Sequence, residues 1–131
     1  MIQPKYNLLL SSSLFIIPTV YGYYNKKYTL STMTLISMLA SMNYWRNPVS
    51  GTRQNVDLVI SKLAGTLYVF YGYNYIHNNI FRMFGYVNGF FMISLYNASC
   101  ILYALKSDSW EYYHVVFHFS TIIGKMIVLY G

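Results

Sequence analysis

Five long apolar runs separated by short polar breaks dominate the pattern of this chain. The breaks fall near residues 25–28, 46–54, 78–83 and 106–109, and the second contains Pro48 and Gly51, which interrupt regular structure. The runs cover about residues 7–24, 28–45, 55–77, 84–105 and 110–130. Each run is about as long as a helix that crosses ~30 Å of hydrocarbon. The pattern therefore predicts five transmembrane helices, each antiparallel to the next because the loops are short.

A transmembrane β-barrel is the competing interpretation, because Tyr, Ile, Val and Thr are plentiful and favour strands. The strands of such barrels are about 10 residues long and alternate apolar with polar positions. The runs of this chain are about twice that length and do not alternate. We therefore expect an all-α, multi-pass transmembrane helical bundle that forms one membrane domain over residues 1–131.

Composition agrees with a membrane location. Hydrophobic residues make up 56% of the chain and charged residues only 9%, whereas a soluble domain carries about 25% charged residues. The formal net charge is +6, but the basic residues are scattered between the runs. This scatter favours anionic lipid headgroups over nucleic acid, which needs clustered charge. Aromatic residues such as Trp45 and Trp110 stand at run ends, as in the aromatic belts of membrane proteins.

The first run contains Pro18, followed by three tyrosines. A cleaved signal peptide would need small residues at its cleavage site, where these tyrosines stand. We therefore expect a retained helix that Pro18 kinks. Cys100 is the only cysteine, so an intrachain disulfide is excluded.

The last run carries a polar stripe. Its members follow one another at spacings of three and four residues, which places them on one helix face: Glu111, His114, His118, Thr121 and Lys125. Ionisable groups are costly at membrane depth. We therefore expect this stripe to face the interior of the bundle.

Two other runs carry stripes of small or hydroxyl residues, which let helices approach closely. One stripe comprises Ser31, Thr34, Ser37 and Ser41, and the other comprises Asp57, Ser61, Gly65 and Gly72. We expect both stripes to point inward, and Arg53 to pair with Asp57 one helical turn away. Lys62 and Lys125 are interpreted as cations that extend along the helix to reach the headgroups.

Two interpretations of the histidines stay open. His114 and His118 could share one metal ion, with Asp57 as a third ligand or as the holder of a water, because two His and one Asp suffice for zinc. Alternatively, the histidines hydrogen-bond across the bundle, and Asp57 pairs with Arg53 or Lys62. The local sequence does not bring Asp57 to the histidines, so tertiary packing decides between the two.

Ser41, Trp45 four residues later, Asp57 in the following run and His114-x3-His118 in the last run form a pattern. It resembles that of the superfamily of alkaline ceramidases and progestin/adiponectin receptors. The resemblance implies a seven-helix membrane fold in which three histidines hold a zinc that activates water for hydrolysis of lipid amides or esters. Trp45 stands where the first zinc histidine would be, and about two helices fewer are present. The resemblance therefore implies a shortened, degenerate and non-catalytic relative.

A second resemblance rests on Asn43-Tyr44-Trp45-Arg46 together with Arg53, Asp57 and Lys62. This segment is similar to short uncharacterised membrane proteins of large DNA viruses. The resemblance implies a virus-encoded component of a host membrane or of the virion's inner membrane. Its partners would then be other membrane or capsid proteins, besides the lipid bilayer.

Two hypotheses for function follow. The first is a structural or assembly role, in which the polar stripes lock the helices together. The second is a zinc-dependent intramembrane hydrolase of lipid amides or esters that uses Asp57, His114 and His118, with Ser41. We favour the structural role, because the sequence shows no nucleophile–base pair, phosphate-binding loop or transporter repeat. Zinc is the one cofactor that the second hypothesis would require.

Overall fold

The computed structural model describes residues 5–48 and 51–130, and every regular element in these two ranges is an α-helix. The helices are α1 (Tyr6–Ser13), α2 (Ile16–Tyr24), α3 (Tyr28–Trp45), α4 (Thr52–Tyr75), α5 (Asn79–Ala104) and α6 (Trp110–Tyr130). The first predicted run is divided between α1 and α2, and each of the other runs forms one helix. The all-α prediction is confirmed for the described residues.

The break between α1 and α2 lies one turn before Pro18. Proline has no N–H, and its ring crowds the carbonyl of the residue four positions earlier, which is Leu14 here. The chain makes tighter turns at this point, since Phe15 N donates to Ser12 O at 3.1 Å and Ile17 N donates to Leu14 O at 3.1 Å. The kink predicted from Pro18 is confirmed.

One predicted helix boundary is wrong. The break expected over residues 78–83 lies earlier, because α5 already begins at Asn79. Asn78 caps this helix: its Oδ1 accepts from Ile80 N at 2.9 Å and from Phe81 N at 3.4 Å. Arg82, which had suggested a loop, lies inside the first turn of α5.

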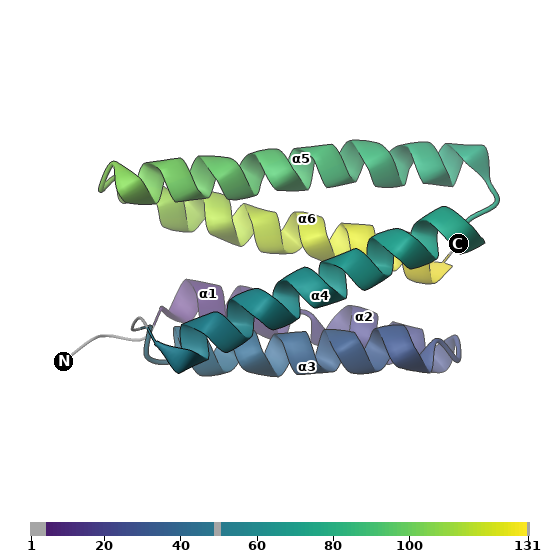
Figure 1. Ribbon diagram of the computed structural model, residues 1–131, viewed down its shortest axis with the longest axis horizontal. Coiled ribbons are helices and arrows are strands. Elements are labelled where there is room, and N and C mark those ends of the chain that lie inside the picture. The colour runs from purple at the N-terminus through teal and green to yellow at the C-terminus, as the bar shows by residue number, and fades with distance from the viewer. Residues whose placement is uncertain (1–4, 49–50, 131) are drawn as a thin grey trace.

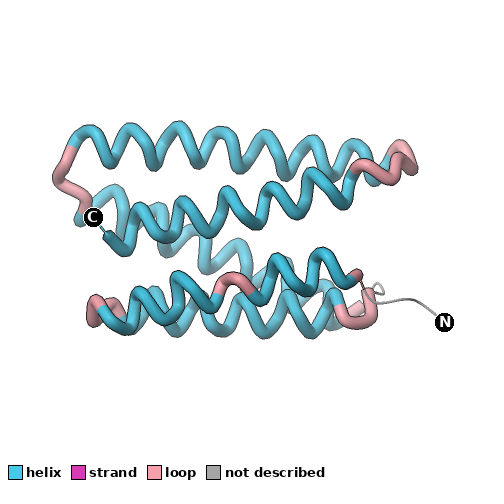
Figure 2. The backbone as a smooth tube through the Cα atoms, turned by 180° about the vertical axis from the view of Figure 1, so that it is seen from behind, coloured by secondary structure: helices cyan, strands magenta, loops and turns pink. Residues whose placement is uncertain are grey.

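The helices form two groups joined by α4 (Figure 1). The antiparallel hairpin of α5 and α6 forms one group, and α1, α2 and α3 form the other, while α4 crosses diagonally between them. The view from behind shows α1 and α2 lying along α3, with the break between α1 and α2 as a short loop (Figure 2). Helix α6 contacts α1, α2, α4 and α5. Residues on α6 can therefore reach both groups.

The turn between α2 and α3 is fastened to the far end of α6. Lys26 adopts a positive φ of 62° in this turn. The neighbouring Lys27 donates from Nζ to the carbonyls of Val128 at 3.2 Å and Leu129 at 2.7 Å. Burial lowers the pKa of Lys27 below its ordinary value. These carbonyls belong to the last turn of α6, where intrahelical partners are lacking, so Lys27 caps that helix.

Burial is inverted relative to a soluble domain. Many of the buried side chains are polar or charged, including Asp57, His118 and Lys125. Large apolar side chains are exposed along the helices; Phe90 is 77% and Val69 68% exposed. Charged side chains are almost never fully buried in soluble proteins unless they are paired. By length and composition, α5 and α6 could each cross a membrane.

The polar stripes face inward to different extents. All four residues of the α3 stripe are buried, namely Ser31, Thr34, Ser37 and Ser41. On α6, His118 and Lys125 are buried, while Glu111 and His114 are half-buried. On α4, Asp57 is buried but Ser61 is exposed. The inward orientation is therefore confirmed for α3 and α6, and on α4 it holds fully only for Asp57.

Candidate functional site

Ser41 and Asp57 meet where the end of α3 lies against the start of α4. Ser41 Oγ donates to Asp57 Oδ1 at 2.5 Å, and Ser61 Oγ donates to the same oxygen at 3.3 Å. Ser41 is 6% and Asp57 8% exposed. A buried carboxyl group needs such partners, because unpaired polar groups are costly away from water. The hydroxyl stripe of α3 therefore supplies the main partner of Asp57.

The predicted pairing of Arg53 with Asp57 is wrong. Arg53 donates to the backbone carbonyls of Asn43 at 3.3 Å and Asn47 at 2.9 Å. These carbonyls lie in the last turn of α3 and just beyond it, where a helix leaves acceptors without intrahelical partners. Arg53 therefore closes the α3–α4 loop. Lys62 is exposed on α4 and makes no ion pair with Asp57 within residues 5–48 and 51–130.

His114 and His118 lie side by side on α6, with ring centroids 4.8 Å apart and planes inclined by 77°. Each ring meets a serine from a different helix through Nδ1. His118 Nδ1 lies 2.7 Å from Ser11 Oγ of α1, and His114 Nδ1 lies 3.4 Å from Ser99 Oγ of α5. The two histidines thus connect α6 to both helix groups, as the hydrogen-bonding interpretation requires.

Trp45 connects the histidines to the Ser41–Asp57 junction. It lies one turn after Ser41 on α3, and its ring packs edge-on against His114 with centroids 5.3 Å apart. Trp45 is buried, and its Nε1 has no hydrogen-bond partner among the described residues. The five positions of the superfamily-like pattern therefore lie in one connected region of the bundle.

These residues do not complete a metal site. In the described ranges, no group of three or more His, Cys, Asp or Glu could hold a metal ion. The structure pairs His114 with His118 and binds Asp57 to two serines, but it does not assemble all three as one ligand set. A catalytic zinc site ordinarily has three protein ligands, and Trp45 offers none.

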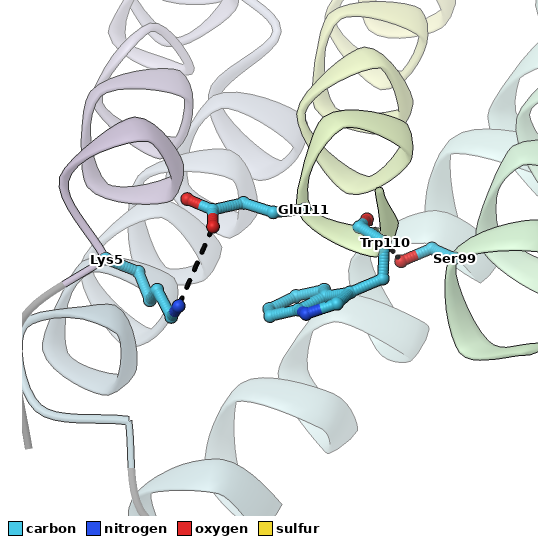
Figure 3. Close-up of polar contacts among 4 residues, drawn as sticks. All are labelled: Lys5, Ser99, Trp110 and Glu111. Carbon is cyan, nitrogen blue, oxygen red and sulfur yellow. Dashed lines mark hydrogen bonds and ion pairs between the residues drawn. The ribbon is translucent and has the colours of Figure 1, made fainter. Parts of the chain in front are cut away.

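Glu111 marks the end of the α6 stripe, near the start of α1 (Figure 3). Its carboxylate lies 3.6 Å from Lys5 Nζ, and the two side chains are 25% and 40% exposed. Lys5 Nζ also lies 5.6 Å from the centre of the Trp110 ring. On the other side, Ser99 Oγ donates to the carbonyl of Trp110 at 3.1 Å. An ion pair this exposed contributes little by itself, but it links α1 to α6.

Lys125 does not extend to the surface, so its interpretation as a headgroup-reaching cation is wrong. Its side chain is 5% exposed. Nζ lies 4.5 Å from the centre of the Phe15 ring and 5.3 Å from that of Tyr68. The kink of the first run brings Phe15 inward, and the aromatic faces attract the ammonium. Lys125 makes no ion pair among the described residues.

Two further interhelical contacts were missed by the reasoning from sequence. Asn88 Nδ2 donates to Ser120 O at 3.0 Å, and Ser120 Oγ donates to Asn88 Oδ1 at 3.0 Å, which joins α5 to α6. Tyr68 Oη lies 2.5 Å from Thr34 Oγ1, which joins α4 to α3. The available signal was a lone amide or hydroxyl in the middle of an apolar run.

Comparisons of the chain with protein-family models, with curated proteins and with solved structures give no match. Both resemblances therefore stay predictions.

Proposed function

We propose that this chain is a multi-pass integral membrane protein with a structural or assembly role. In this proposal α1 and α2 form one kinked span, and α3, α4, α5 and α6 form four more. The polar groups inside the bundle hold the spans together, and the apolar exterior contacts lipid.

The inverted burial is the observation that carries the proposal. Asp57, His118 and Lys125 are each less than a tenth exposed, whereas Phe90 and Val69 are more than two thirds exposed. In water this arrangement would expose apolar surface far beyond what soluble monomers tolerate. In a bilayer the same arrangement is favourable, because the charged groups avoid hydrocarbon and the apolar groups enter it.

Polar contacts between helices support the structural role. Ser41–Asp57 joins α3 to α4, Ser11–His118 joins α1 to α6, and Ser120–Asn88 joins α6 to α5. Apolar burial does little to associate helices within lipid, since the lipid tails are equally apolar. Close packing and such hydrogen bonds must therefore hold the bundle together.

Alkaline carbonate extraction tests the membrane assignment. Membranes from cells that express the full chain are washed at high pH, and the protein is followed in pellet and supernatant. We expect it to stay in the pellet, whereas a peripheral marker protein is released. Release of this chain with the marker would refute the assignment, because spanning helices resist the treatment.

The assembly role would involve other membrane or capsid proteins, as the likeness to viral membrane proteins implies. Chemical cross-linking in the membrane, followed by identification of the attached chains, tests this part of the proposal. Recovery of the same protein neighbour from independent preparations is expected. If the chain cross-links only to lipid, the assembly role is refuted, and the polar contacts serve only the stability of this protein.

A second candidate, a zinc-dependent hydrolase of lipid amides or esters, is favoured by one arrangement. Ser41, hydrogen-bonded to Asp57, lies one turn from Trp45, which packs on His114, the neighbour of His118. The ligand set lacks a third imidazole, so we place this function second. Metal analysis of purified protein separates the two: stoichiometric zinc would favour the hydrolase, and its absence the structural role.

A further inference from the structure

A groove of about 130 Å³ opens between α4, α5 and α6. Its wall is mostly apolar and contains glycines from all three helices: Gly65 and Gly72, Gly85 and Gly89, and Gly124. A Cβ added at Gly65 or Gly89 would meet nothing within 4 Å. The chain therefore leaves space beside Gly65 and Gly89, where part of an apolar rod such as an acyl chain can lie.

Two cations stand in the wall of this groove. Lys125 is the buried lysine, and its Nζ lies 5.3 Å from the ring of Tyr68, another wall residue. Arg82 belongs to the first turn of α5 and lines the same groove. Phe81 and Tyr130 pack with ring centroids 5.3 Å apart, so the start of α5 lies beside the end of α6. Arg82 donates to Tyr73 O at 3.3 Å and lies 5.3 Å from the Tyr73 ring. The two cations therefore line neighbouring parts of the groove, Arg82 beside Tyr73 and Lys125 beside Tyr68.

Among the described residues, no acidic side chain pairs with either cation. The chain has three acids. Asp57 is bound by Ser41 and Ser61. Glu111 and Asp108 lie at or beyond the opposite end of α6, and Glu111 is ~21 Å from Lys125 along the helix at 1.5 Å per residue.

We propose that the groove binds an anionic phospholipid. Its phosphate lies between Lys125 and Arg82, and part of one acyl chain lies beside Gly65 and Gly89. A buried ammonium without a counter-ion is costly, and basic pockets between membrane helices bind anionic headgroups. A zwitterionic lipid fits less well, because its quaternary ammonium adds a positive charge beside two others. This inference rests on the membrane assignment proposed above.

The test uses the full chain reconstituted into phosphatidylcholine vesicles that contain spin-labelled phosphatidylglycerol or spin-labelled phosphatidylcholine. Electron paramagnetic resonance measures the motionally restricted fraction of each labelled lipid. We expect the wild type to prefer phosphatidylglycerol by about fivefold or more, as one cation near the headgroup suffices for such a factor. Lys125→Met should reduce this preference to near one, and Arg82→Gln should reduce it in part.

Lys62→Met is the matched control, because Lys62 is exposed on α4 and does not line the groove; it should leave the preference unchanged. Gly89→Leu places a side chain in the open space and should lower the restricted fraction while Lys125 is retained. A wild type without preference, or Lys125→Met that keeps it, would overturn the proposal. Loss of the preference in excess inorganic phosphate would assign the site to a free anion instead.

Flotation of the vesicles separates this inference from the membrane assignment. Protein that does not float with the vesicles after a carbonate wash would refute the assignment itself. Protein that floats but restricts both lipids equally would refute only the lipid site.

Discussion

Removal of the Ser41 hydroxyl should destabilise the junction between α3 and α4. In Ser41→Ala, Asp57 Oδ1 loses its donor at 2.5 Å and keeps only Ser61 Oγ at 3.3 Å. The carboxyl group stays buried, because the substitution opens no path to solvent. The variant therefore measures how much stability the protein loses when a buried carboxyl group is deprived of its main hydrogen-bond donor.

The magnitude follows from two bounds. A buried polar atom left without its partner costs about 1–3 kcal/mol. Interhelical hydrogen bonds within membranes average about 0.6 kcal/mol and reach about 1.7 kcal/mol. Because Asp57 keeps the weaker partner, we expect Ser41→Ala to lower the free energy of unfolding by about 1–2 kcal/mol. Ser94→Ala should cost less than about 0.5 kcal/mol, since Ser94 is exposed and bonds only to Phe90 O of its own helix, at 2.9 Å.

Equilibrium unfolding in mixed micelles with increasing dodecyl sulfate measures these energies, with tryptophan fluorescence as the signal. A double-mutant cycle with Asp57→Leu isolates the contact, because replacing both partners by apolar groups removes the unmet polar atom. Ser41→Ala should then cost much less in the Asp57→Leu background. Strictly additive effects, or equal effects of Ser41→Ala and Ser94→Ala, would refute the reasoning.

Two further predictions concern helix packing and orientation. Gly22→Ala should lower the free energy of unfolding by about 1–3 kcal/mol through overpacking, because the added Cβ would collide with a buried hydroxyl on α3. Gly65→Ala is the control and should be tolerated, since a Cβ there meets open space. Equal losses of stability in the two variants would contradict this prediction. In a Cys100→Ala background, a lipid-phase thiol reagent should label a cysteine at Phe119, which is 45% exposed, far more than one at His118, which is 5% exposed. The opposite labelling order would mean that the polar stripe faces lipid.

Features that depend on one helix alone were predictable from the sequence. The stripe of Glu111, His114, His118 and Lys125 follows from the 100° step between residues, and its inward direction was predicted from the cost that charge would have in lipid. The kink before Pro18 is local in the same sense. The missed boundary near Arg82 is also local: a charged residue suggested a loop, while Asn78 supplied the stronger signal as a helix cap.

Features that depend on two helices were not predictable in this way. Arg53 lies one turn from Asp57 on the same helix, yet the two do not pair. Arg53 binds backbone carbonyls at the end of α3, and Asp57 accepts from the hydroxyl of Ser41 on α3. Lys125 has a side chain long enough to reach the headgroups, yet the kink places Phe15 against its ammonium. In both cases the crossing of two helices selects the partner, and a single sequence does not specify that crossing.

The missing imidazole offers a way to test the likeness to the hydrolase pattern. Nitrogen ligands about 2.0–2.1 Å from a tetrahedral zinc place their ring centres roughly 5 Å apart. The ring centres of His114 and His118 are 4.8 Å apart, and those of Trp45 and His114 are 5.3 Å apart. A histidine at position 45 would therefore add an imidazole beside His114, on the side that faces α3.

We predict that Trp45→His binds one equivalent of Co²⁺ with the intense visible absorption of tetrahedral coordination, and that the wild type does not. Trp45→Phe is the control, since it removes the indole without adding a ligand. Metal binding by Trp45→His would indicate that the bundle already holds the other ligands of a metal centre in position. Only the third ligand would then be missing from the wild type. If Trp45→His binds no better than Trp45→Phe, the likeness of Ser41, Asp57 and the two histidines to a hydrolase pattern is coincidental. The polar interior would then serve only to hold the helices together.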